Sequence, residues 1–579
     1  MAHPALALFR ADGASGRLTE SAEPEWQPCA CDDVILAELT SLEITSRTIT
    51  TCPDILTRCT RLTRLQVHDC TALQALPQRF CDSLEVLEIR NAPQLTGLPA
   101  SLGALPMLHT LVLDGVNGSL HVPSPGCLKN VTYGPNCHTR RDWLSNLNTL
   151  ETLEIRGLSF VQFTLPVSCK KLHVRAACRV ENDAVRDIAM RCTIPEDTLL
   201  TELEITDAFA LHRLPESLQT CQRFVSLTLK NCASLTMLPD SFGHLQWLET
   251  LSIDSAELLA LPATFGQLKR LTRLDIAFCP ITALPESMHG LESLSSLCLL
   301  HCTYLCMVPS CTLPQLADMT LDTLPRLQTF PMIAGSLRRL CVLETPTLNL
   351  PDWLAKVAMT SVSLRFCSIP PGLQTQTSLL HLNLSYNSLR DPNILATFSN
   401  LTSLLISNQP ELPELSLASV PNLRQLTLTR LQLLKTISGM AQLHALEEVC
   451  IHWCLALVSL PDAIGTLPAL KHLKLASLST PLPVLHNVSR LLSLELHCVA
   501  KRVPAAYGCV PDVNVECFYC WHGFNTVALK GAYGRYQRIL MLVLAGRRIG
   551  RTLPAEIMYI VSEWLIPDGM VGFTCDCLE

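Results

Sequence analysis

Residues 224–268 read FVSLTLKNCASLTMLPDSFGHLQWLETLSIDSAELLALPATFGQL and contain one pattern twice, an apolar residue followed by x-x-Leu-x-[Leu/Ile]. The first copy begins at Phe224 and the second at Leu248. In each copy the last two apolar residues alternate with a polar one, which is the period of a half-buried strand. A pattern that returns at a fixed period of this length predicts stacked units that share one apolar core.

The pattern recurs along almost the whole chain. Nineteen clear copies begin between Leu39 and Leu491, and weaker ones begin near Leu128, Cys169 and Val510. Counting the first two weak copies, 452 residues divide into 20 intervals of about 22.6 residues. The interval from Cys169 to Leu200 is stretched to 31 residues, so we expect a surface insertion there. The sequence therefore predicts about 21 repeats over residues 35–516.

Cysteines share a phase of this repeat. The chain has 28 cysteines among 579 residues, and several begin the motif C-x-x-L-x-x-L-P, as in residues 70–77 and 232–239. A small donor placed there can satisfy backbone carbonyls where the chain turns away from the strand. We expect buried, reduced thiols instead of disulfides or metal ligands, because the cysteines lie a full repeat or more apart. The phase holds Cys70, Cys232, Cys279, Cys302, Cys367, Cys454 and also Asn387.

Composition excludes several classes of protein. Apolar residues make up 48% of the chain and charged residues 16%, which argues against intrinsic disorder. The net charge is −7, whereas nucleic-acid-binding proteins typically carry an excess of basic residues, so binding to nucleic acid is not expected. The longest apolar run, residues 539–546, is too short to span a membrane, and no basic segment precedes the short apolar stretch at the N-terminus. We expect a cytoplasmic protein, with a receptor-type or secreted module as the alternative.

The repeats resemble those of the leucine-rich repeat family, in its short, proline-anchored variety. The blocks LPDSFGHL (residues 238–245) and LPATFGQL (residues 261–268) are similar to repeats of plant disease-resistance proteins and Ras-pathway scaffold proteins. The resemblance covers residues 35–516 and implies a curved α/β solenoid in which parallel strands line a concave, ligand-binding face. No G-x-x-x-x-G-K-[ST] motif is present, so the nucleotide-binding domain of the plant proteins is not expected.

The resemblance places the variable positions of the strands on the concave face. These positions are rich in acidic residues in the first half of the chain, with occasional Arg and Lys, then neutral, and finally rich in His and Lys. Such a gradient can orient a protein ligand, although charged residues also serve simply to solvate an exposed face. The histidines fall on different strands, so neither a pH switch nor a metal site is expected. The predicted partner-binding residues are Glu85, Glu88, Glu151, Glu154, Glu202, Glu204, His381, His452, Lys474 and His497.

The two ends lack the repeat. Residues 1–34 are interpreted as a flexible lead and partial cap, and residues 517–579 as a helical segment. Cys517-x-x-Cys520-x-His522 has no second CxxC pair, so we expect no zinc site. A helix is predicted after Gly550, with Thr552 as its N-cap.

This last helix resembles the opening of an F-box, the segment by which that family docks onto the adaptor subunit of cullin–RING ubiquitin ligases. A complete F-box needs about three helices, whereas 14 residues remain after Leu565. The alternative is an amphipathic helix that caps the last repeat. The docking residues implied by the resemblance are Leu553, Pro554, Ile557, Ile560, Val561 and Leu565.

An enzymatic function is not expected. The sequence contains no G-x-S-x-G, H-E-x-x-H or phosphate-binding loop, and an open solenoid face is not a catalytic pocket. We therefore predict no catalytic residues, no cofactor and no bound metal. The predicted function is protein recognition or scaffolding in signalling, with the substrate-recognition adaptor of a ubiquitin ligase as the alternative.

Overall fold

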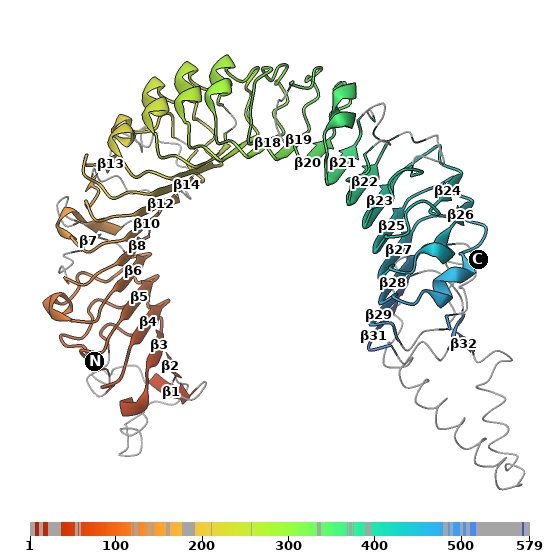
Figure 1. Ribbon diagram of the computed structural model, residues 1–579. Helices are drawn as coiled ribbons and strands as arrows, with labels where there is room; N and C mark the ends of the chain where they lie inside the picture. The colour runs from red at the N-terminus through yellow and green to blue at the C-terminus, as the bar shows by residue number, and fades with distance from the viewer. Residues whose placement is uncertain are drawn as a thin grey trace, which may run out of the picture. The chain divides into compact units, whose positions relative to one another are not determined.

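The computed structural model describes residues 6–516 with gaps, of which the longest are 21–35 and 176–191, and also Met570–Gly572. Residues 517–569 and 573–579 lie outside the description. The chain divides into two compact units, Met1–Leu316 with Pro331–Gly335 and Ala317–Phe330 with Ser336–Glu579. In each unit, taken by itself, successive repeats contribute one strand each to a parallel sheet (Figure 1).

The first unit begins with a hairpin, in which β1 is antiparallel to β2, and β2 is parallel to β3. From β2 onward, each strand pairs in parallel with the strand of the next repeat. The hairpin gives Leu6–Arg10 and Ser15–Glu20 a place in the sheet, within the segment that the sequence predicts to be a flexible lead and partial cap. The strands are β1 (Leu6–Arg10), β2 (Ser15–Glu20), β3 (Ser41–Thr45), β4 (Arg64–His68), β5 (Val86–Arg90), β6 (Thr110–Asp114), β8 (Asn130–Tyr133), β10 (Thr152–Arg156), β12 (Lys171–Arg175), β14 (Glu202–Thr206), β15 (Ser226–Lys230), β16 (Thr250–Asp254), β17 (Arg273–Ala277) and β18 (Ser296–Leu300).

The second unit continues the same arrangement, again with parallel neighbours. Every predicted copy of the repeat supplies a strand, including the weak copies near Leu128, Cys169 and Val510. The predicted leucine-rich repeat solenoid is therefore confirmed as the fold. The strands are β19 (Asp318–Asp322), β20 (Arg339–Leu343), β21 (Ser361–Arg365), β22 (His381–Ser385), β23 (Ser403–Ser407), β25 (Gln425–Thr429), β27 (Glu448–His452), β28 (His472–Ala476), β29 (Ser493–His497) and β31 (Asp512–Glu516).

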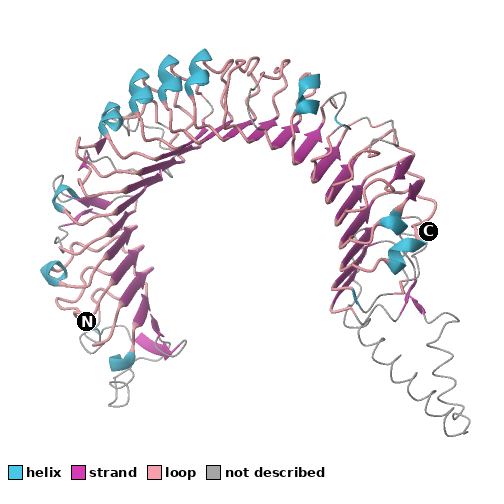
Figure 2. Cartoon of the chain, in the orientation of Figure 1, coloured by secondary structure: helices cyan, strands magenta, loops and turns pink. Residues whose placement is uncertain are grey.

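Short 3-10 helices lie on the side of each unit away from the strands (Figure 2). Most follow a proline in extended conformation, as at Pro239 and Pro262, because the proline ring fixes φ near the value that a helix start requires. The 3-10 helices are η2 (Ala100–Ala104), η3 (Leu144–Asn146), η6 (Glu216–Thr220), η7 (Asp240–His244), η8 (Ala263–Gln267), η9 (Glu286–Gly290), η10 (Asp352–Lys356), η12 (Met440–Gln442) and η13 (Asp462–Thr466).

In the part of the chain that the structure describes, four short ladders add to the main strands in these connections. Three are parallel and one is antiparallel. The ladders are β7 (Gly118–Leu120) with β9 (Cys137–Thr139), β11 (Phe163–Thr164) with β13 (Cys192–Thr193), β24 (Glu414–Ser416) with β26 (Thr436–Ser438), and β30 (Arg502–Pro504) with β32 (Met570–Gly572).

Among the described residues, no helix combines the length and the apolar character needed to cross a membrane.

The core of each unit is a continuous stack of leucines. In most strands the second and fourth residues are buried and the first, third and fifth are partly exposed. Leu227, Leu251 and Leu274 are aligned across β15, β16 and β17, so each repeat covers the apolar side of its neighbour. This is the burial that the L-x-x-L-x-L pattern predicts, since no single repeat can enclose its own leucines.

The turn after the strand explains the cysteine phase. In most repeats the residue directly after the strand has a positive φ, as at Asp69 and Asn231. In the repeats that have the cysteine, it is the next residue. The Cys70 thiol is the donor to two backbone carbonyl oxygens, that of His68 at 3.4 Å and that of Ile44 at 3.6 Å. Asn387 occupies the same place and donates to the Leu364 carbonyl at 2.9 Å. The predicted role of a small donor in this phase is confirmed.

These thiols are expected to be unreactive in the folded protein. Burial raises the pKa of Cys232 to about 12 and that of Cys454 to about 11, and only the thiolate is a nucleophile. With iodoacetamide at pH 8, mass spectrometry should find the exposed Cys306 labelled and both buried residues protected until the chain is denatured. Labelling of Cys232 or Cys454 as fast as Cys306 would contradict the packing described here.

Candidate functional site

The candidate site is the exposed side of the parallel sheet. We call this surface the strand face: it consists of the first, third and fifth residues of each strand and the residue preceding the strand. In each unit, considered alone, the strands lie along the inner side of the curve, so the strand face is concave (Figures 1 and 2). Residues in register on neighbouring strands are about 4.8 Å apart, which allows side chains from different repeats to pair.

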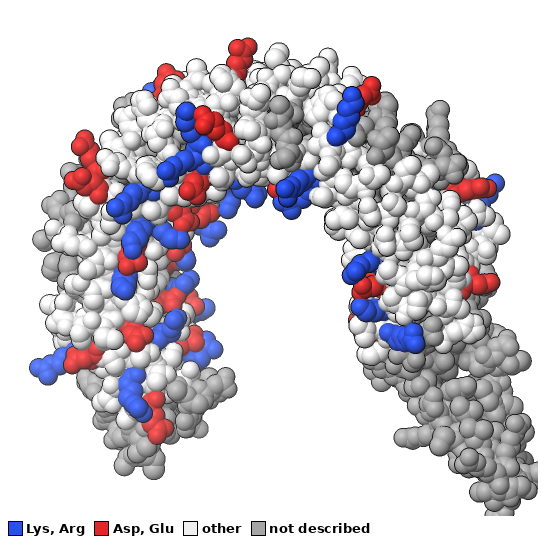
Figure 3. Space-filling view, viewed as in Figure 1, with Lys and Arg blue, Asp and Glu red and all other residues white. Residues whose placement is uncertain are grey.

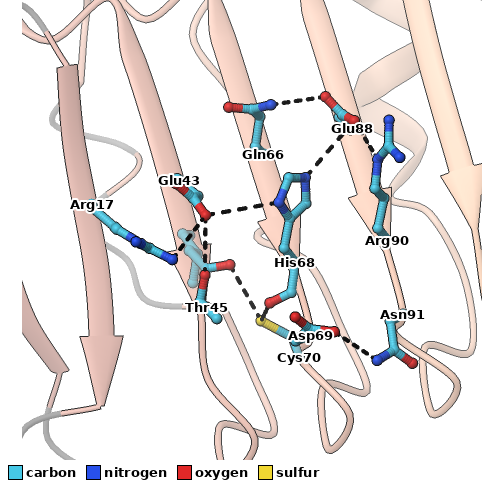
Figure 4. Close-up of polar contacts among 11 residues, drawn as sticks. Arg17, Glu43, Thr45, Gln66, His68, Asp69, Cys70, Glu88, Arg90 and Asn91 are labelled. Atoms are coloured by element: carbon cyan, nitrogen blue, oxygen red, sulfur yellow. Dashed lines mark hydrogen bonds and ion pairs between the residues drawn. The ribbon is translucent and has the colours of Figure 1, made fainter. Parts of the chain in front are cut away.

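Glu88 on β5 is the centre of the first network (Figure 4). It accepts a hydrogen bond from Gln66 Nε2 at 2.9 Å and another from Arg90 Nε, and His68 Nε2 lies 3.8 Å from its carboxylate. Burial by itself would raise the pKa of Glu88, but the hydrogen bonds from Gln66 and Arg90 outweigh it and hold the pKa below its usual value. Glu88 is therefore a structural anion that orders its neighbours.

The same network extends to the N-terminal hairpin. His68 Nδ1 lies 3.8 Å from Glu43, and Arg17 on β2 lies 3.3 Å from the same carboxylate (Figure 4). The sequence reading did not use Arg17, because the residues around it lack the leucine pattern. Only the pairing of β2 with β3, which aligns Arg17 with Glu43, brings the two residues together.

Glu154 on β10 forms the second network. It accepts a hydrogen bond from Arg156 Nε at 2.7 Å and one from the Thr132 hydroxyl at 3.3 Å, and Arg156 also reaches Asp114 at 3.5 Å. Burial would raise the pKa of Glu154, yet the hydrogen bond and charge of Arg156 hold it below its usual value. Three consecutive strands, β6, β8 and β10, are linked in this way.

Glu202 and Glu204 on β14 form the third network. Lys171 lies 2.7 Å from Glu202, Lys230 lies 3.2 Å from Glu204, and His173 lies within 4 Å of both carboxylates. Lys171 and His173 belong to the weak repeat at Cys169, and the sequence reading passed over both as face residues. A recognisable signal existed, since the repeat phase places them at the first and third positions of a strand.

The first unit therefore presents a mixed-charge strand face, although the sequence pattern had emphasised its acidic residues. Acidic and basic side chains alternate along its inner side (Figure 3). Each of the six predicted glutamates has a basic residue or a histidine within 4 Å. For Glu151 the partner is Lys170, and for Glu85 it is His109. Charge is thus distributed as local pairs and not as one acidic field.

Three of the predicted residues of the second unit, His381, His452 and Lys474, lie on the strand face without forming one cluster. His381 is the exposed first residue of β22, and His452 is the last residue of β27. Lys474 on β28 pairs with Glu495 on β29 at 2.5 Å. His497 is the last residue of β29, and its side chain lies outside the described part of the chain. The predicted docking residues between Leu553 and Leu565 also lie outside it.

Comparison with known proteins yields structural likenesses only. No protein-family model and no curated protein matches this sequence. A leucine-rich repeat protein of Leptospira interrogans is 20% identical, with 64% of this chain and 92% of that chain covered and a TM-score of 0.38. The plant peptide hormone receptor RGFR1 in complex with RGF2 is 14% identical, with 87% and 98% covered and a TM-score of 0.35. TLR13 in its complex with ssRNA13 is 16% identical, with 89% and 92% covered and a TM-score of 0.39.

These likenesses carry no functional argument at such identities and TM-scores. The leucine-rich repeat fold is instead assigned from the repeat itself, the buried leucines and the residue-by-residue register of the strands.

Proposed function

We propose that this protein is a non-enzymatic recognition protein that binds a protein ligand on the strand face. The observation that supports the proposal is the set of cross-strand ion pairs that hold long side chains in place on an open surface, as at Glu202 and Glu204. Side chains that are already ordered lose less conformational entropy when a ligand binds. A pattern of paired charges favours a protein surface with the complementary pattern over a uniformly charged polymer.

The centre of the proposed site is the run of strands from β10 to β15. It contains Glu151, Glu154, Glu202 and Glu204, which the sequence singled out, and the basic partners Lys171 and Lys230. In the second unit, the face that carries His381, His452, Lys474 and His497 is proposed as a further contact region. A role as a scaffold or recogniser in signalling is consistent with this arrangement.

Reversing charge at the centre of this site is expected to weaken ligand binding by about tenfold or more. The double substitution Glu202→Lys/Glu204→Lys removes the acceptors of Lys171 and Lys230 and places four cations on the three neighbouring strands β12, β14 and β15. The dissociation constant for a partner captured by the wild-type chain would be measured by calorimetry, with folding checked by circular dichroism.

Glu292→Lys is the matched control. Glu292 follows the outer helix η9 and also pairs with a lysine of the neighbouring repeat, Lys269, at 3.0 Å. This control should leave affinity unchanged because its ion pair, which is more exposed than those of Glu202 and Glu204, does not lie on the strand face. Equal affinities of the wild type and the double variant would remove β14 from the site.

The alternative function, substrate recognition for a cullin–RING ubiquitin ligase, rests on the sequence pattern at Leu553–Leu565. If that helix docks an adaptor subunit, the strand face would select the substrate. A receptor-type or secreted recognition module would use the same face.

A further inference from the structure

Three neighbouring strands in the main sheet of the second unit lack acidic residues, Lys and Arg on their exposed side. They read HLNLS (β22), SLLIS (β23) and QLTLT (β25), and their first, third and fifth residues include no Asp, Glu, Lys or Arg. We call these nine residues, together with Leu380 directly before β22, the Leu405 window. The strands on both sides, β21 and β27, carry a charged residue in the same positions, so the window is a distinct section of the strand face.

Ion pairs occupy the strand face on either side of the Leu405 window. On one side, Arg365 on β21 lies 3.3 Å from Glu344. On the other side, Lys471 lies 2.6 Å from Glu447. Along the inner side of the second unit, uncharged surface separates two groups of charged side chains (Figure 3). An uncharged centre within a charged rim is the usual anatomy of a protein interface, whose core is depleted of charged residues.

Leu405 places an aliphatic side chain in the middle of the window. The strand register aligns it with Asn383 on β22 and with Thr427 on β25. At this third position the other described strands of the second unit carry Thr, Cys, Ser, Asn, Lys or Glu, whereas Leu405 is apolar and partly exposed. Leu380 in the same window is 37% exposed. Covering these leucines with an apolar side chain of a partner would remove apolar surface from water, which favours binding.

Polar groups of the window are free to bind a ligand. Asn383 Oδ1 accepts a hydrogen bond from the Ser385 hydroxyl at 2.6 Å. Asn383 Nδ2 and the Ser403 hydroxyl have no hydrogen-bond partner among the described residues. In the first unit, by contrast, the polar groups of Glu154 and Arg156 bind each other. Uncharged donors and acceptors can bind the N–H and C=O groups of a peptide backbone, and no ion has to leave water when they do so.

We infer that the Leu405 window is the centre of the ligand interface in the second unit and takes an uncharged segment of a partner protein that carries a large apolar side chain. The inference rests on the function proposed above and adds the chemistry of the ligand. A carboxylate or ammonium group placed here would lose water without gaining a counter-ion from the window. A nucleic acid is unsuitable because the window offers its phosphates no Lys or Arg. A neutral polysaccharide is less suitable because it has no aliphatic side chain to cover Leu405.

The test is selection of random 12-residue peptides displayed on phage against the full-length chain, with counter-selection against Leu405→Asp. Enriched peptides should share a run of residues without Asp, Glu, Lys or Arg that includes a large apolar residue. By fluorescence anisotropy they should bind Leu405→Asp and Thr427→Asp at least about tenfold more weakly than wild type, because each variant buries an unpaired carboxylate beneath an uncharged peptide. Both positions are partly exposed, so both variants are expected to fold, which circular dichroism would check.

Thr320→Asp is the matched control. Thr320 is the partly exposed third residue of β19, as Thr427 is of β25. Five strand spacings, roughly 24 Å, separate the two positions, which exceeds the Debye length at physiological salt. The control should therefore bind the selected peptides as wild type does. Equal losses in Thr320→Asp and Thr427→Asp would show that the added charge does not act within the window and would overturn the inference.

The inference is also overturned if no peptide depends on Leu405, or if the selected peptides carry charges throughout. Neutral oligosaccharides whose binding is lost in Thr427→Asp, with no peptide enriched, would assign the window to a carbohydrate instead. Peptides lost in Glu202→Lys/Glu204→Lys but never in Leu405→Asp would overturn this inference and leave the proposed function standing. If no peptide is lost in either variant, both are contradicted.

Discussion

Replacing Phe265 by alanine is expected to destabilise the first unit by about 3–5 kcal/mol. The Phe265 side chain on η8 is fully buried, and its ring lies parallel to that of Phe242 on η7, with centroids 6.5 Å apart. Alanine would remove a large apolar ring between two repeats that can close the resulting cavity only in part. Urea denaturation followed by circular dichroism should show an earlier transition. Hydrogen exchange should rise in peptides from residues 238–276.

The control for this prediction removes an exposed apolar side chain from a neighbouring repeat. Met237 is 52% exposed, so Met237→Ala should change the free energy of unfolding by less than about 0.5 kcal/mol. Because each repeat contacts chiefly its neighbours, faster exchange in Phe265→Ala should remain near η7 to η9. Similar stabilities for the two variants would show that the Phe242–Phe265 stack does not support the outer side of the unit.

Replacing Gly266 by alanine is expected to cost about 3 kcal/mol, although it adds a single methyl group. A Cβ at this position would lie 1.7 Å from the carbonyl oxygen of Ser287 in the next repeat. A Cβ added at Gly243 would lie 2.5 Å from the Thr264 carbonyl oxygen, and one added at Gly290 would lie 2.3 Å from the Gly266 carbonyl oxygen. The neighbouring repeats approach each other so closely here that backbone, and not a movable side chain, opposes the added atom.

Gly97→Ala is the matched control, since a Cβ there would have no atom within 4 Å. Both substitutions lower the conformational entropy of the unfolded chain, because alanine is less flexible than glycine. The difference between their midpoints of urea denaturation therefore reports the effect of space between the repeats. A destabilisation by Gly266→Ala no greater than that by Gly97→Ala would contradict the close approach of η8 and η9.

The pattern of leucines predicted the strands because it depends on residues within one repeat. Even the weak copies near Leu128 and Cys169 form strands, since two alternating apolar residues are sufficient once the neighbouring strands provide a ladder. The cysteine phase was predictable for the same reason. Cys70 and Asn387 satisfy carbonyls of their own turn or of the repeat before, and every repeat poses the same requirement.

The candidate sites were predictable only in part. The sequence indicated Glu202 and Glu204, but their partners Lys171 and Lys230 lie on other strands, 31 and 26 residues away in the chain. The repeat pattern covers only about 23 residues, so it cannot show which residues of different repeats form ion pairs.

By itself, the sequence determined the solenoid, the places of the strands and the residues that form the core. These depend on the apolar periodicity of each unit and on the need of every unit to bury its leucines against the next. Only the tertiary structure decided which charges neutralise one another, that the N-terminal hairpin joins the sheet, and which apolar side chains remain exposed at its edge. Those properties depend on the register between repeats and on distances of a few ångströms, and both arise only when the units stack.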